Sequence, residues 1–281
     1  MDGIRHSVAG ADGVRIGLLT AGSGSALLLV HGAMGSIERW EPVWPALTRR
    51  RRVTAMDRRG RRSSGDGDRY TLSSEFGDVA AVAAALADDQ GEPVDALGHS
   101  FGGTCVLGAA AQGAPFRRIV LYEPPGAQTA SMQWLDELSD MIAAGQTSQA
   151  TFSFLTKIIG LTASQVEELS RAPGGRDVLS IVAATLPREG RAVADADLAA
   201  AARLVRQPVL LLLGRLSPPW AAEVTHEIAA ALAEPTVTEL DAVGHEALDA
   251  APDRVVAEVL RFLDQAAAAL SPDCTSQRGL G

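Results

Sequence analysis

The sequence has little of what several large protein classes require. Its 281 residues include two cysteines, Cys105 and Cys274, too few for a disulfide framework or a cysteine-based metal cluster. The longest apolar runs, 26–30 and 208–213, are too short to cross a bilayer. The composition therefore predicts neither a disulfide-stapled protein nor a membrane-spanning one.

Positive charge is also in deficit. The formal net charge is -9 at pH 7 and the pI is near 5.1, which argues against a nucleic-acid partner. Residues 1–6 lack the apolar run of a signal peptide, and 22–24 precede a strand, so they fail the context of a dinucleotide-binding loop. We expect a soluble cytoplasmic protein that takes a small-molecule substrate and needs no cofactor, metal or membrane; the sequence leaves its oligomeric state open.

Short apolar runs alternate with helical patterns along the chain. Continuous apolar runs such as 26–30 and 208–213 are typical of strands buried on both faces. We therefore expect an α/β fold with a mostly parallel central sheet and helices on both faces. Residues 127–206 contain only helix-like segments, which predicts a helical cap inserted into a core of 1–126 and 207–270. Residues 271–281 read as a disordered tail, and 40–49 as a helix.

One segment carries the pattern of a reactive serine. Gly98-His99-Ser100-Phe101-Gly102 matches G-x-S-x-G between a predicted strand, 94–98, and a helix of small residues, 104–111. There the turn is tight enough to strain the serine backbone and expose its oxygen, so only small residues fit two positions away. The pattern makes Ser100 the candidate nucleophile, although so short a motif also fits an ordinary glycine-rich turn.

A serine nucleophile needs a base to take its proton. His245 is the best candidate because it follows a glycine after the last predicted strand and comes after the serine in the chain. His31 ends another strand, and we interpret it as a structural residue of its loop. Eight arginines lie between positions 49 and 62. We interpret them as a solvated helix end and loop paired with local acids, since the chain as a whole is acidic.

Taken together, these motifs resemble the α/β-hydrolase family over roughly residues 14–268. The resemblance rests on residues 31–35, 57–63, 98–103 and 244–245, in the family's order and spacing. It implies that Ser100 is the nucleophile and His245 the general base. It also implies that the backbone N–H groups of Ala33 and Phe101 form the oxyanion hole, and that 127–206 is the family's helical cap.

The acid that orients the base departs from the usual family pattern. The family commonly places it after the strand at 208–213, where this chain has Ser217. Some members carry it after the preceding strand, which here gives Glu123. We favour Glu123 as the acid over a purely structural role. Asp241 and Glu246 are near His245 in sequence, but we expect the chain direction to aim them elsewhere.

We therefore predict a serine hydrolase that cleaves an ester, lactone or thioester of a medium-sized hydrophobic molecule through an acyl-enzyme. Carbon–carbon bond hydrolysis is a related possibility on the same fold. The alternative is a non-hydrolytic protein on this scaffold, either a ligand-binding protein or a cofactor-free lyase or cyclase. The missing carboxylate at position 217 motivates that alternative.

Overall fold

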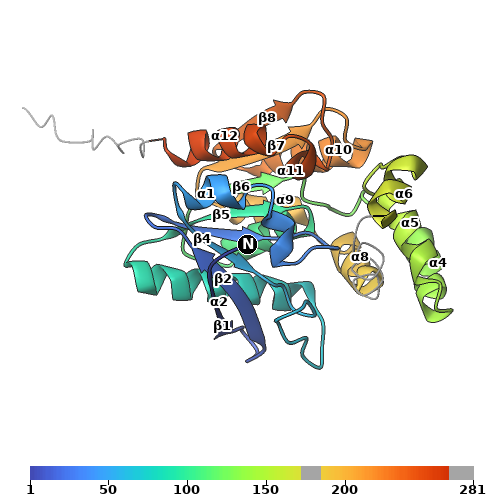
Figure 1. The fold of residues 1–281 in the computed structure, drawn as a ribbon, viewed down its shortest axis with the longest axis horizontal. Coiled ribbons are helices and arrows are strands. Elements are labelled where there is room, and N and C mark those ends of the chain that lie inside the picture. The colour runs from blue at the N-terminus through green and yellow to red at the C-terminus, as the bar shows by residue number, and fades with distance from the viewer. Residues whose placement is uncertain (172–184, 266–281) are drawn as a thin grey trace, which may run out of the picture.

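An eight-stranded sheet forms the centre of the molecule (Figure 1). The structure is a computed structural model that describes residues 1–171 and 185–265. The strands follow the order β1-β2-β4-β3-β5-β6-β7-β8. Neighbouring strands from β4 to β8 run parallel, whereas β1 and β2 are antiparallel to their neighbours. The strand bounds are β1 Ile4–Ala9, β2 Arg15–Ala21, β3 Ala26–Val30, β4 Arg52–Met56, β5 Val94–His99, β6 Phe116–Tyr122, β7 Val209–Gly214 and β8 Pro235–Leu240. The predicted α/β class is confirmed.

The central strands are apolar because helices cover both faces of the sheet. Every residue of β3, β5 and β7 is buried, whereas the edge strand β1 is mostly exposed. One apolar cluster packs α2, α3, α9 and α10 against one face. A second packs η1, α1, α11 and α12 against the other. The helix bounds are η1 Ile37–Trp40, α1 Trp44–Thr48, α2 Leu72–Gln90, α3 Phe101–Ala111, α9 Leu198–Leu204, α10 Pro219–Ala231, α11 Ala247–Ala250 and α12 Pro252–Leu263.

The helix predicted over 40–49 is wrong as a single element. The chain instead forms the short 3-10 helix η1 and then α1, with a turn between them. Pro42 lies in that turn, and it has no N–H to donate to the carbonyl of Glu38 in a continuous helix. Pro45 sits in the first turn of α1, where a missing N–H costs nothing.

Between β6 and β7 the described chain is helical. Its elements are α4 Met132–Ala143, α5 Thr147–Lys157, α6 Ala163–Arg171, α8 Leu186–Ala194 and α9. Helices α4, α5 and α6 stand apart from the sheet at the right of Figure 1, while α9 contacts the core helices α3 and α10. The division into a core and a cap over 127–206 remains a proposal. The predicted tail, 271–281, lies outside the described residues.

Within the described ranges, no helix is both long and apolar enough to span a membrane.

Candidate active site

Ser100 occupies a strained turn between β5 and α3. Its φ of 53° and ψ of -129° are unusual for a residue other than glycine, and its N–H donates to the Tyr122 carbonyl at 2.8 Å. A Cβ added at Gly98 would lie 2.6 Å from the Gly102 carbonyl oxygen. At Gly102 it would lie 2.0 Å from the Val30 carbonyl oxygen. The two flanking glycines are therefore required by close backbone approach.

His245 and Glu123 form a buried hydrogen-bonded pair. His245 Nδ1 lies 2.6 Å from Glu123 Oε2, and the side chains are 3% and 0% exposed. Glu123 directly follows β6 and has a positive φ of 46°, which turns its side chain out of the strand pattern. His245 Nε2 is buried and has no hydrogen-bond partner among the described residues. Since His245 and Ser100 line the same cavity, this nitrogen is available to a group bound there.

The second oxygen of Glu123 is also satisfied. Oε1 accepts hydrogen bonds from the Gly214 N–H and from Ser217 Oγ, each at 2.6 Å. Ser217 stands where the family commonly has its acid, and here it donates to the carboxylate of Glu123. Asp241 pairs with Arg215, and Glu246 accepts from the Gly244 N–H, whereas Glu123 is the carboxylate that binds His245 in the described part of the chain.

Two further histidines lie near Ser100, and backbone groups bind both ring nitrogens of His31 and one ring nitrogen of His99. His31 Nε2 accepts from the Arg58 N–H at 3.1 Å, which leaves Nδ1 to donate to the Gly32 carbonyl at 2.8 Å. His99 Nε2 contacts the His245 carbonyl at 3.2 Å. Burial lowers the pKa of both rings, and the nearby Arg58 and His245, respectively, lower it further. Both rings are neutral near pH 7.

The loop that follows β3, residues 31–36, packs directly on Ser100. A Cβ on Gly32 would lie 2.9 Å from Ser100 Cβ, so the loop after β3 approaches the turn closely. Ala33 and Phe101 line a cavity together with Ser100. Phe101 is the first residue of α3, where a backbone N–H has no acceptor inside the helix. Ala33 and Phe101 thus both lie beside Ser100.

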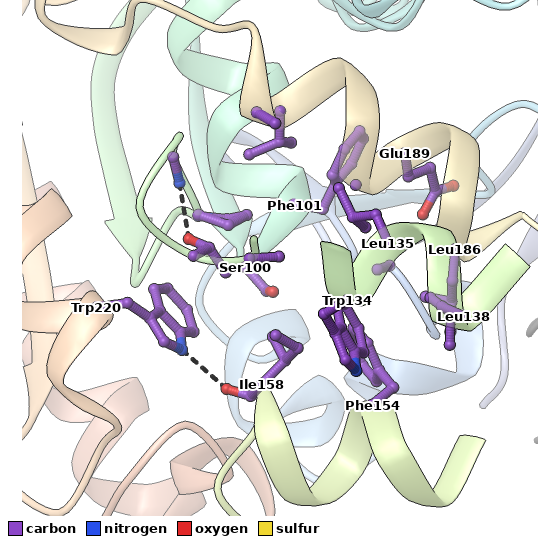
Figure 2. Close-up of a pocket in the computed structure, with 18 residues that line it drawn as sticks. Ser100, Phe101, Trp134, Leu135, Leu138, Phe154, Ile158, Leu186, Glu189 and Trp220 are labelled. Atoms are coloured by element: carbon purple, nitrogen blue, oxygen red, sulfur yellow. Dashed lines mark hydrogen bonds between the residues drawn. The ribbon is translucent and has the colours of Figure 1, made fainter. Parts of the chain in front are cut away.

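Two cavities meet at Ser100. The first, which we call the Trp134 cavity, is lined mainly by apolar side chains of α4, α5 and α8 and by Trp220 (Figure 2). The second, the His245 cavity, is lined by His245, His99 and residues of α5 and α6. Ala33, Ser100 and Phe154 line both. Trp220 connects His245 to the end of α5. Its ring lies edge-on to His245, and its Nε1–H donates to the Ile158 carbonyl at 2.8 Å.

The arginines between 49 and 62 are only partly as expected. They do pair with acids, but four of them are buried rather than solvated: Arg51, Arg58, Arg59 and Arg61. Arg59 binds Asp78 through two nitrogens, at 2.7 and 2.9 Å. Pairing with carboxylates brought in by other elements is what makes burial of these guanidinium groups possible.

Arg58 and Arg61 belong to a charged cluster beside the loop that follows β3. Arg58 donates to Glu75 at 2.6 Å and to Glu189 at 3.2 Å, and Arg61 donates to Glu189 at 2.7 Å. Arg58 also donates to the backbone carbonyls of His31 and Gly32, and Arg61 to that of Ala33. The cluster thus fixes the loop and ties it to α8. Burial raises the pKa of Glu75 to about 7, despite the opposing effect of Arg58.

Sequence reasoning missed this cluster, and Glu189 above all. Position 189 lies more than a hundred residues from the arginines it binds, on a segment that carried no motif. The signal that could have found it is the density of arginines between positions 49 and 62. If some of these guanidinium groups are buried, acidic residues from elsewhere in the chain must pair with them.

Within residues 1–171 and 185–265, no group of histidine, cysteine, aspartate and glutamate side chains is arranged to hold a metal ion.

The chain belongs to the alpha/beta hydrolase family, whose model matches residues 27–258. It is similar to an N-formylmaleamate deformylase of Pseudomonas putida, 39% identical over 41% of this chain and 43% of that protein. It is 28% identical to a 2-hydroxy-6-oxo-2,4-heptadienoate hydrolase of another Pseudomonas putida strain, over 73% of this chain and 76% of the other. Among solved structures, an alpha/beta hydrolase from Sphaerobacter thermophilus matches with a TM-score of 0.80 and 28% identity, covering 92% of this chain and 100% of that one.

Proposed function

We propose that this protein is a serine hydrolase that cleaves an ester, lactone or thioester through an acyl-enzyme. The observation that carries the proposal is the buried pair of His245 and Glu123 beside the strained Ser100, with His245 Nε2 unpartnered within the described chain. A base oriented on one nitrogen and free on the other is what a serine nucleophile requires.

The geometry supports a role for each of these residues. Ser100 Oγ attacks the substrate carbonyl and passes its proton to His245 Nε2, while Glu123 holds the proton on Nδ1 and stabilises the resulting imidazolium. The N–H groups of Ala33 and Phe101 receive the oxyanion. His245 then protonates the leaving group, and a water molecule activated by the same histidine releases the acid and restores Ser100.

The lining of the Trp134 cavity supports a medium-sized hydrophobic substrate. Its side chains include Trp134, Leu135 and Phe154, and they lie next to Ser100 in Figure 2. Two of the relatives carry names of other activities: one is a deformylase and one a hydrolase of a dienoate. We place esters before amides, because no motif of the sequence suggests recognition of a peptide terminus.

The hydrogen bond between Glu123 and His245 favours hydrolysis over the non-hydrolytic alternative. It rested on the missing carboxylate at position 217, and Glu123 provides a carboxylate for His245 from the neighbouring strand. We propose that the core, 1–126 and 207–270, carries the reacting groups and that 127–206 covers them. A cytoplasmic location is likewise a proposal.

Steady-state hydrolysis of a panel of p-nitrophenyl esters, lactones and thioesters tests the proposed function, with Ser100→Ala as the control. We expect an acyl chain of intermediate length to give the highest kcat/KM, and Ser100→Ala to abolish turnover. An N-formyl amide and a 2-hydroxy-6-oxo-2,4-dienoate in the same panel would detect the chemistry named for the relatives. Turnover that survives in Ser100→Ala would reject the acyl-enzyme.

A further inference from the structure

Glu189 is the one charged side chain among the described residues that line the Trp134 cavity. It lies on α8, is 1% exposed, and stands across the cavity from Trp220, with Ser100 between them in Figure 2. An ionised carboxylate in an otherwise apolar wall is costly unless its oxygens accept hydrogen bonds. The hydrogen bonds of Glu189 therefore show how its carboxylate is stabilised in this wall.

The two oxygens of Glu189 differ. Oε1 accepts from Arg61 at 2.7 Å and from Arg58 at 3.2 Å. Oε2 is buried and accepts from no group in the described part of the chain. Because Glu189 lines this cavity, a ligand bound there can donate a hydrogen bond to this buried acceptor.

The charges around Glu189 restrict what that ligand can be. At pH 8, above the pKa of about 7 of Glu75, the two guanidinium groups of Arg58 and Arg61 face the two carboxylates of Glu75 and Glu189, and these charges balance. A substrate carboxylate would bring a second acceptor to Oε2 and be repelled. An ammonium group would add an uncompensated buried charge. A neutral donor, such as a hydroxyl group, satisfies Oε2 and leaves the balance intact.

The cavity that holds this donor is the one for the acyl group. The leaving group must contact the residue that protonates it, and His245 lines the His245 cavity but not the Trp134 cavity. The acyl chain therefore extends from Ser100 into the Trp134 cavity, toward Glu189.

We propose that Glu189 Oε2 determines acyl specificity by accepting a hydrogen bond from a hydroxyl group on the distal part of an otherwise apolar acyl chain. This inference rests on the proposed function for the direction of the chain. The binding it predicts needs no catalysis, and it can be measured on the Ser100→Ala protein.

The test compares three series of methyl esters of increasing chain length that end in a hydroxyl, a methyl or a methyl-ketone group. Their dissociation constants are measured calorimetrically on Ser100→Ala protein at pH 8. At the length that reaches Glu189, we expect the hydroxyl ester to bind about 10- to 100-fold more tightly than the other two. Equal affinities at every length would mean that water serves Oε2, and would overturn the proposal.

Adding Glu189→Gln gives the sharper result. Arg58 and Arg61 can only donate, so the amide oxygen stays on them and the NH₂ group faces the cavity. We expect the methyl-ketone ester, which only accepts, to gain about 10-fold in affinity over the methyl ester in this variant. A merely structural Glu189 would not produce that gain. The matched control is Glu137→Gln on the exposed side of α4, which should keep the hydroxyl preference.

If Glu189→Gln fails to fold, the paired substitution Glu189→Leu with Arg61→Met removes both partners and leaves Arg58 with Glu75. We then expect the methyl ester to bind as tightly as the hydroxyl ester, and a retained hydroxyl preference would contradict the proposal. Fluorophosphonate labelling of the wild type reports separately whether Ser100 is activated. Labelling of Ser100 without a preference for the hydroxyl ester would reject this inference alone. A preference for the hydroxyl ester without labelling of Ser100 would reject the proposed serine hydrolase.

Discussion

Two buried glutamates flank Ser100, and they differ in how completely their hydrogen bonds are made. Glu123 has both oxygens satisfied, by His245, by the Gly214 N–H and by Ser217. Glu189 has one oxygen bound by two arginines, and its other oxygen has no donor among residues 1–171 and 185–265. A completed network fixes a side chain in one position, which suits the orientation of a base. An incomplete one suits a ligand that arrives later.

The largest expected effect comes from breaking the complete network. Glu123→Gln presents an amide to His245 Nδ1 and favours the wrong tautomer of the ring, so we expect the rate of serine labelling and kcat to fall about 10³- to 10⁴-fold. Rates are measured by stopped-flow labelling and ester hydrolysis. Asp241→Asn is the control, since Asp241 pairs with Arg215 at the surface. A strong loss in Asp241→Asn and none in Glu123→Gln would reverse the assignment.

The same substitution at the other glutamate separates the two roles. We expect Glu123→Gln to lower kcat/KM for hydroxyl and ketone esters by the same factor, whereas Glu189→Gln changes their ratio about 10-fold or more. Competition between the two esters in one reaction, followed by mass spectrometry, measures the ratio directly. An unchanged ratio in Glu189→Gln would show that the two glutamates do not differ in this way.

A smaller effect follows from loosening Glu123 without removing it. Ser217→Ala deletes one of the two donors to Oε1 and leaves the Gly214 N–H in place. Because hydrogen bonds to a charged group are stronger than neutral ones, we expect kcat to fall about 3- to 10-fold. Ser217→Thr keeps the hydroxyl group and should restore most of the rate. No difference between the alanine and threonine variants would mean that this donor does not position Glu123.

The smallest effect concerns stability rather than rate. Burial raises the folded-state pKa of Glu75 from 4.5 to about 7, so its contribution to stability is fully present below pH 4.5 and is lost as the pH rises through 7. In Glu75→Gln this loss between pH 5 and 8 should be absent. Chemical denaturation over that range measures it, with Glu92→Gln on the surface as the control. Parallel stability profiles for Glu75→Gln and the wild type would contradict the shift.

The sequence allowed the first glutamate to be predicted but not the second. Ser100, His245 and Glu123 follow strands whose apolar patterns are visible, and parallel strands bring their carboxyl ends to one edge of a sheet. Glu189 lies on a helix of the segment between β6 and β7. Nothing in the local sequence around Glu189 shows that this helix packs against the loop that follows β3.

The arginines between positions 49 and 62 also show that tertiary contacts could not be predicted from the local sequence. Their number suggested acidic partners, but the expectation that those partners are local and solvated failed at Arg58 and Arg61. Whether a charge is buried depends on tertiary contacts, and Glu189 is reached from Arg58 across 131 positions. The broken helix over 40–49 was foreseeable from Pro42 and Pro45, because proline has local consequences.

Intact-protein mass spectrometry after fluorophosphonate treatment tests the central claim most directly. Fluorophosphonates modify only an activated serine, so the account predicts one adduct on the wild-type protein, none on Ser100→Ala and very slow formation on Glu123→Gln. An adduct on Ser100→Ala, or the absence of any adduct on folded wild-type protein, would contradict it.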